Sequence, residues 1–242
     1  YYFDIDEDRQ HPTKWHRPLA IGAVTKQQAV LLMLGLWGVD SGGAYLLNPA
    51  FLAIVIAYVF LNMLYSFKLK HIPILDITII AIGFVLRVFA GAVLIAVTPT
   101  MWIVLVTFLL ALFLALAKRR DDCLLSLQGK ATRKNIDGYN VELVNAAMVL
   151  MAAVTLVSYI MYTVSPEVVA RFGSDYLYLT SLFVIVGILR YMQITFVEEN
   201  SGSPTQLLLK DRFLQLTLVG WVASFGLVKF LWKRSFGISC LR

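Results

Sequence analysis

The chain has 242 residues, of which 59% are hydrophobic and 15% are charged, and its mean hydropathy is +0.75. Soluble domains are about half apolar and a quarter charged, so this composition excludes an ordinary soluble enzyme and favours a polytopic helical membrane protein. The formal net charge of +6 suits either nucleic acid or anionic lipid, and the distribution of the charge along the chain has to decide between them. Cys123 and Cys240 are the two cysteines, and their wide separation argues against a disulfide or zinc framework.

The chain begins with a polar segment, residues 1–18, that combines acidic and basic residues. Asp4 and Asp8 share one face if this segment is helical. Magnesium in proteins is usually held by one or two carboxylates together with substrate phosphates and water. Lys14 and Arg17 follow as cations that could bind phosphate. We interpret the segment as a Mg²⁺ and phosphate site with Asp4 and Asp8 as metal ligands; a solvated acidic helix end is the plainer alternative.

Seven apolar stretches are long enough, or nearly so, to cross a bilayer, which takes about 20 residues per helix. They are residues 27–47, 50–66, 74–96, 100–117, 143–164, 177–196 and 214–232. The sequence therefore predicts an all-α transmembrane bundle with seven spans in this chain.

The loops between these stretches alternate in charge. Most lysines and arginines lie in residues 1–26, 67–73, 118–142 and 197–213, whereas the opposite loops carry only Arg171. The positive-inside rule places the basic set in the cytoplasm, and a basic C-terminal tail is the exception. We therefore expect a multi-pass protein of the cytoplasmic (inner) membrane, with no nucleic-acid partner.

Almost all polar residues that could do chemistry lie on this predicted cytoplasmic side. A one-sided arrangement suits an enzyme that takes a soluble substrate from the cytosol, and we favour that class. A transporter would place polar residues near the middle of the membrane. A transporter or a non-catalytic scaffold stays as the other class, and it predicts that Asp4→Asn is tolerated.

Five candidates surround the second and third spans. Tyr65, Lys68 and Lys70 close the second span, although lysines beside a membrane are usually topological anchors. Asp76 lies just inside the third span, and Arg87 lies about 16 Å deeper along the same helix. Charges within a membrane indicate function by default. A buried structural ion pair is the alternative for these two.

A second group of candidates lies at the predicted end of the fourth span. Lys118 and Arg119 begin a basic run that ends in Asp122, and Arg133 follows in the next loop. A stop signal that complements the helix dipole would explain three basic residues here. The further cations of the loop exceed what such an anchor needs. Weaker candidates come later in the chain: Arg190, Tyr191 and Arg212.

These segments resemble the motifs of a known family, the UbiA superfamily, in its polyprenyl-phosphate phosphoribosyltransferase branch. The resemblance is carried by residues 4–18, 65–70, 76, 84–91, 118–122, 190–191, 202–204 and 211–212. It implies one UbiA-like domain over residues 1–242, and a bundle of nine helices of which the first two precede this chain. Tyr1 stands where the family has Asp, and Asp122 stands where the family has Glu.

The resemblance also implies a reaction: 5-phosphoribose passes from phosphoribosyl pyrophosphate to a polyprenyl phosphate lipid, and pyrophosphate leaves. Magnesium on Asp4 and Asp8 would stabilise the leaving group, with Lys14 and Arg17 as further donors. The 5-phosphate and the lipid phosphate would meet a set of cations, and Asp122 would orient these or touch the ribose. That set is Lys68, Lys118, Arg119 and Arg133.

An ordinary UbiA-type prenyltransferase, which joins a polyprenyl diphosphate to an aromatic acceptor, is the alternative within the family. Such an enzyme handles a single diphosphate and usually relies on two aspartate-rich motifs. The basic run at residues 118–120 fits a donor with a second phosphate better. A homo-oligomer stays open.

Overall fold

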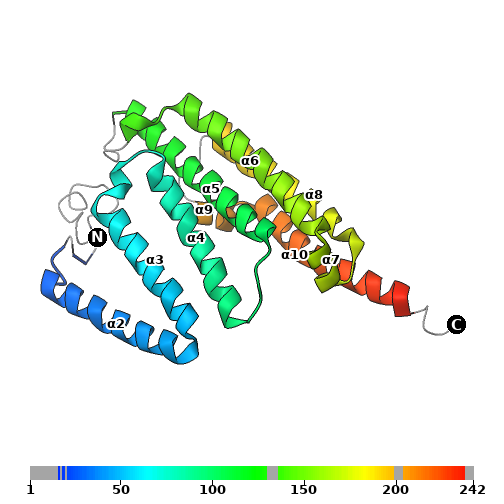
Figure 1. Cartoon of the computed structure of the whole chain (residues 1–242). Coiled ribbons are helices and arrows are strands. Elements are labelled where there is room, and N and C mark those ends of the chain that lie inside the picture. The colour runs from blue at the N-terminus through cyan, green and yellow to red at the C-terminus, as the bar shows by residue number, and fades with distance from the viewer. Residues whose placement is uncertain (1–15, 17, 20, 130–135, 199–203, 238–242) are drawn as a thin grey trace. The chain divides into compact units, whose positions relative to one another are not determined.

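The chain folds into helices, and the residues that the structure describes contain no strand. This computed structural model describes residue 16 and residues 18–19, 21–129, 136–198 and 204–237 (Figure 1). Side chains are described up to residue 228. The helices in chain order are α2 (Lys26–Leu47), α3 (Pro49–Phe67), η1 (Leu69–His71), α4 (Leu75–Leu94), α5 (Met101–Leu127), η2 (Ile136–Gly138), α6 (Val141–Val164), α7 (Pro166–Phe172), η3 (Asp175–Thr180), α8 (Ser181–Phe196), α9 (Pro204–Lys210) and α10 (Arg212–Gly237).

Short polar residues set the beginnings of the long helices. The Thr25 hydroxyl accepts the backbone N–H of Gln28, whose side chain accepts the Thr25 N–H in return, so a capping box starts α2. Asn48 ends α2 and caps α3 with its side-chain oxygen, and Pro49 follows in the first turn of α3. Thr100 caps α5 in the same way. Local chemistry thus accounts for where the apolar stretches become helices.

The predicted all-α membrane bundle is confirmed, and six of the seven predicted spans correspond to helices that could cross a membrane. Within the described residues six helices, from α2 to the η3–α8 pair, are long and apolar enough to cross a membrane. The seventh predicted span coincides with α10, whose described apolar part, Arg212–Val228, is shorter. Large apolar side chains on these helices, such as Leu31, Leu46 and Phe60, are exposed as lipid-facing residues would be. The chain is a multi-pass membrane protein.

The predicted end of the fourth span is wrong. The sequence placed it at residue 117, but α5 continues to Leu127, so the basic run at residues 118–122 lies inside the helix. Lys, Arg and Leu are good helix formers, and the first strong breaker is Gly129, which has a φ of 71°. Charged residues end the apolar stretch without ending the helix. The predicted loops 165–176 and 197–213 likewise contain the short helices α7 and α9.

Contacts divide the chain into two compact units. The single domain predicted from the sequence stays a prediction. Unit 1 comprises residues 1–79 and 86–98, and unit 2 comprises residues 80–85 and 99–242. In unit 1, α2 packs against α3, and η1 turns the chain from α3 toward α4. This unit carries the candidates from Tyr65 to Arg87.

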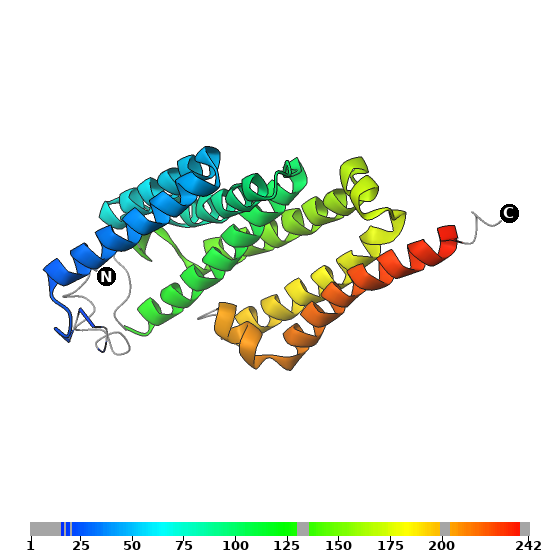
Figure 2. The same cartoon turned by 90° about the horizontal axis from the view of Figure 1, so that it is seen from below.

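Unit 2 is a bundle in which α6 lies beside α5 and α8, and α10 lies beside α8 (Figures 1 and 2). Gly220 of α10 lies so close to Phe183 of α8 that an added Cβ would come within 2.5 Å of the ring. Hydrogen bonds also join the helices, because the Trp221 N–H donates to the Tyr159 hydroxyl, which in turn pairs with Thr180. Small residues and buried hydroxyls at helix contacts are the usual means of packing helices within a membrane.

Candidate functional site

Several predicted site residues lie outside the part of the chain that the structure describes. They are Asp4, Asp8, Lys14, Arg17 and Arg133, and they include both predicted metal ligands. Their roles stay predictions. The remaining candidates fall into two groups, one in each unit.

In unit 1, the connection between α3 and α4 carries three of the candidates. Lys68 is exposed at the C-cap of α3, and Lys70 is half-buried in η1. Asp76 is completely buried in the first turn of α4, where a carboxylate complements the positive end of the helix dipole. Ile74, two residues earlier, has a φ of 67°, which a β-branched residue rarely adopts. Backbone strain of this kind concentrates at functional sites.

The other two candidates of unit 1 lie on the helices themselves. Tyr65 is half-buried in the last turn of α3. Arg87 lies far along α4, where its guanidinium donates a hydrogen bond to the hydroxyl of Tyr58 and stands 5.0 Å from the centroid of that ring. Contact with a ring face stabilises a cation, most strongly away from water. Sequence reasoning missed Tyr58, although a phenol within an apolar span was a signal for it.

In unit 2, the basic run on α5 separates into one exposed and two buried residues. Lys118 is exposed, whereas Arg119 is 1% and Arg120 is 5% exposed. Successive helical side chains point about 100° apart, so three consecutive cations cannot all face one ligand. Arg119 donates through Nη1 to Asp122 one turn later, which makes these two candidates one ion pair. Lys118 is therefore the member of the run that is open to solvent.

Arg120 joins three helices and was not among the predicted site residues. Its Nε donates to Asn145 Oδ1 on α6 at 2.9 Å, and its Nη1 donates to the Thr195 carbonyl on α8 at 2.7 Å. Its guanidinium lies 5.3 Å from the centroid of the Phe196 ring. We call the end of unit 2 where Arg120 joins α5, α6 and α8 the polar end.

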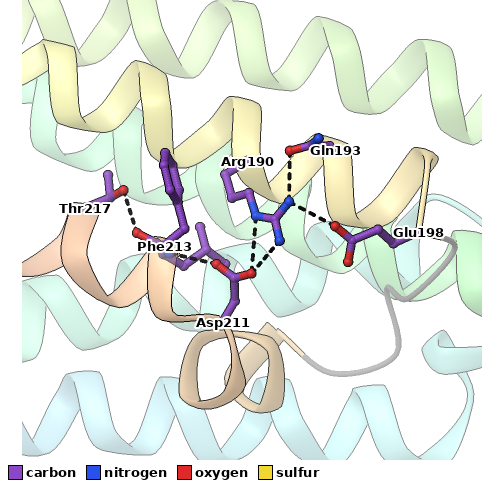
Figure 3. A network of polar contacts seen from close by, with 7 residues as sticks. Arg190, Gln193, Glu198, Asp211, Phe213 and Thr217 are labelled. Atoms are coloured by element: carbon purple, nitrogen blue, oxygen red, sulfur yellow. Dashed lines mark hydrogen bonds and ion pairs between the residues drawn. The ribbon is translucent and has the colours of Figure 1, made fainter.

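Arg190, also at the polar end, is surrounded by side chains of its own unit (Figure 3). Nε and Nη2 donate to Asp211 Oδ2 at 3.2 and 2.6 Å, and Nη1 donates to Gln193 Oε1 and Glu198 Oε1, both at 2.9 Å. The other oxygen of Asp211 accepts the Leu214 N–H at 2.8 Å and so caps α10. The Arg190 guanidinium lowers the pKa of Asp211 below its ordinary value, and the Leu214 N–H acts in the same direction.

The last two predicted residues differ in exposure. Tyr191 is buried with its ring 5.4 Å from that of Phe113, and its hydroxyl has no hydrogen-bond partner among the described residues. Arg212 is exposed as the first residue of α10. Arg190 therefore binds the residue that directly precedes Arg212, namely Asp211. Tyr191 lies in the interior of unit 2.

The lowered pKa of Asp211 predicts a loss of stability in acid. A carboxyl whose pKa is lower in the folded state stabilises the fold above its unfolded pKa, about 3.9, and this stabilisation disappears as the pH falls through the folded value. The unfolding temperature of the purified protein should thus fall more steeply below about pH 5 than that of Asp211→Asn. Parallel curves for the two proteins would show that Asp211 makes no such contribution.

Across residues 21–129, 136–198 and 204–237, no three His, Cys, Asp or Glu side chains come together as a metal site. On α5, Asp122 is already paired with Arg119. Asp4 and Asp8, which lie outside the described residues, stay the candidates for the metal.

Comparisons with known proteins agree with the fold. The model of the UbiA prenyltransferase family matches residues 1–228. Two solved structures of a UbiA homolog from Archaeoglobus fulgidus, one bound to DMAPP and Mg²⁺ and the other to GPP and Mg²⁺, superpose with TM-scores of 0.69 and 0.67. Each covers 96% of this chain and 77% of the solved chain, at 17% and 18% identity.

Curated relatives match over a similar length. A decaprenyl-phosphate phosphoribosyltransferase of Mycolicibacterium smegmatis is 33% identical over 232 residues, which is 92% of this chain and 72% of the relative. Proteins with the same description from Mycobacterium tuberculosis and Corynebacterium glutamicum are 26% and 28% identical, over 92% and 90% of this chain and 73% and 67% of theirs.

Proposed function

Because this chain belongs to the UbiA prenyltransferase family, we propose that it transfers 5-phosphoribose from phosphoribosyl pyrophosphate to a polyprenyl phosphate and releases pyrophosphate. The observation that carries the proposal is the similarity, over at least 90% of the chain, to decaprenyl-phosphate phosphoribosyltransferases from three organisms. The proposed reaction would make the protein a Mg²⁺-dependent glycosyltransferase of the superfamily.

The charges that the chain exposes support this reaction. The donor carries a pyrophosphate and a 5-phosphate, and the acceptor brings a further phosphate. Exposed cations exist in both units, namely Lys68 in unit 1 and Lys118 and Arg212 in unit 2. Arginine can bind two phosphate oxygens at once, and lysine acts as a point charge. Further cations that could bind phosphate lie outside the described residues, namely Lys14, Arg17 and Arg133.

The buried candidates suit supporting roles. Arg119, the residue after Lys118 on α5, is paired with Asp122, and this pair would hold the helix that carries the exposed cation. Tyr58 holds the guanidinium of Arg87 along α4, so that any phosphate or ribose contact of Arg87 is made from a fixed position. Asp76 and Tyr191 are buried, and each would act by supporting the helices of its own unit, as Tyr65 and Lys70 would from half-buried positions in unit 1.

Magnesium would be held by Asp4 and Asp8. When bound to the pyrophosphate, the ion would neutralise the charge that develops on the leaving group. The two structures of the UbiA homolog from Archaeoglobus fulgidus, bound to DMAPP and Mg²⁺ and to GPP and Mg²⁺, support the use of a divalent metal in the family. We place the reaction at the cytoplasmic face of the inner membrane, because most lysines and arginines flank the spans on that predicted side.

A labelling assay tests this function. Membranes that contain the protein are incubated with labelled phosphoribosyl pyrophosphate, Mg²⁺ and a polyprenyl phosphate, and label is expected in the lipid fraction. A parallel incubation with chelator in place of Mg²⁺ should show no transfer. The alternative function has its own arm, in which a polyprenyl diphosphate and an aromatic acid replace both substrates. Transfer in that arm alone would identify the protein as an ordinary prenyltransferase.

A further inference from the structure

Arg190 stands among acceptors of its own unit, although the sequence selected it as a substrate ligand. We propose that Arg190 is a positioning residue: it holds Asp211, and through Asp211 the start of α10 with its exposed cation Arg212, which meets the anionic substrate. The proposal rests on the proposed function for its kinetic part, and its structural part can be tested without activity.

Nearly all N–H donors of the Arg190 guanidinium are hydrogen-bonded within the protein. A guanidinium has five N–H groups. Two of those of Arg190 go to Asp211, one to Gln193 and one to Glu198, so four are bonded within the protein (Figure 3). The side chain is 22% exposed. One N–H remains, so a phosphate could be bound through two oxygens at once only in exchange for one of these hydrogen bonds.

The local charge also disfavours an anion at Arg190. One guanidinium lies between two carboxylates, those of Asp211 at 2.6 Å and Glu198 at 2.9 Å. Together the three groups carry a negative charge at neutral pH, so a phosphate approaching Arg190 would be repelled by them. Arg212, by contrast, is exposed and leads into α10.

Asp211 connects Arg190 to the helix that carries Arg212. Its backbone N–H donates to the Leu207 carbonyl of α9 at 2.9 Å, its carbonyl accepts the Gln215 N–H at 3.1 Å, and its side chain caps the Leu214 N–H. The residue therefore closes α9 and opens α10. Because Arg190 is on α8, its two hydrogen bonds to Asp211 fix this junction to the neighbouring helix, and Arg212 is the next residue of the chain.

The two possible roles of Arg190 predict opposite effects of Asp211→Asn. If Arg190 bound the substrate phosphate, removing a competing carboxylate would free the guanidinium and lower KM for phosphoribosyl pyrophosphate. If Arg190 positions the junction, the same substitution loosens α10 and raises KM. We expect Asp211→Asn and Arg190→Gln each to raise KM about fivefold with a smaller change in kcat. Combined with Arg212→Gln, neither should add to the effect of that single variant.

Glu198→Gln is the matched control. It removes the other carboxylate from Arg190 but leaves the junction of α9 and α10 in place. Its side chain is 46% exposed, and ion pairs so exposed contribute little. We expect an unchanged KM. A fall in KM for either Glu198→Gln or Asp211→Asn would overturn the proposal and assign Arg190 to the substrate.

Hydrogen exchange provides a readout that needs no activity. The Leu214 amide is the group that Asp211 caps, so its exchange rate should rise about fivefold in Arg190→Gln and in Asp211→Ala, which removes the capping oxygen, and stay unchanged in Glu198→Gln. Unchanged exchange in Arg190→Gln would overturn the positioning role. If the unaltered protein transfers no phosphoribose, the proposed function fails, and the exchange data alone decide whether Arg190 holds the junction.

Discussion

Asp4→Asn and Asp8→Asn are each expected to abolish phosphoribosyl transfer, with a loss of about a thousandfold or more in turnover. The amide keeps the size of the side chain but removes the negative charge that would hold Mg²⁺ on the leaving pyrophosphate. The measurement is the labelling assay at saturating Mg²⁺, with the amount of inserted, folded protein determined in parallel. These substitutions should leave insertion unchanged, because they lie before the first apolar stretch.

Asp6→Asn is the matched control for these variants. It removes the same charge from the same acidic segment, but on a helix residue 6 faces away from the side that residues 4 and 8 share. Activity close to that of the unaltered protein is expected. Near-normal activity of Asp4→Asn or Asp8→Asn would remove that residue from the metal site. An equal loss of activity in all three variants would indicate that the segment needs negative charge in general, and not two specific metal ligands.

Arg120→Ala is expected to lower the free energy of unfolding by about 3 kcal/mol, since it removes the donor of one half-buried and one buried acceptor. These are Asn145 Oδ1 and the Thr195 carbonyl, and the contact with the Phe196 ring is lost as well. Arg120→Lys should lose part of this stability, because an ammonium cannot reproduce the fork of a guanidinium. Denaturant unfolding of the purified protein in detergent measures both effects.

Lys118→Ala serves as the control two residues earlier on the same helix. Its side chain is exposed, and exposed substitutions usually change stability by less than about 0.5 kcal/mol. The proposed function nevertheless expects Lys118→Ala to weaken substrate binding. The two variants should therefore differ in what they lose: Arg120→Ala should lower stability, and Lys118→Ala should lower the affinity for substrate. A similar loss of stability in both would mean that the hydrogen bonds of Arg120 add nothing to the fold.

The main features of the fold were predictable from the sequence because they depend on local composition. Apolar stretches of about the thickness of a bilayer became helices, and short polar residues such as Thr25, Asn48 and Thr100 began them. The end of α5 was not predictable from hydropathy, because hydropathy falls at the charged run that begins at residue 118 and the helix continues beyond it. Helix propensity, which continues through Lys and Arg to Gly129, decides where the helix ends.

The sequence by itself determined that this protein is a helical membrane protein of the UbiA family, and it located the charged motifs along the chain. The sequence could not assign different roles to neighbouring cations, because charge and residue type do not determine which way a side chain faces. Only the tertiary structure distinguished the exposed Lys118 from the buried Arg119 and Arg120. It also showed that the guanidinium of Arg190 is hydrogen-bonded to Asp211 and Glu198. The physical reason is that helical rotation and the partners on neighbouring helices decide these roles, and those partners come from parts of the chain far away in sequence.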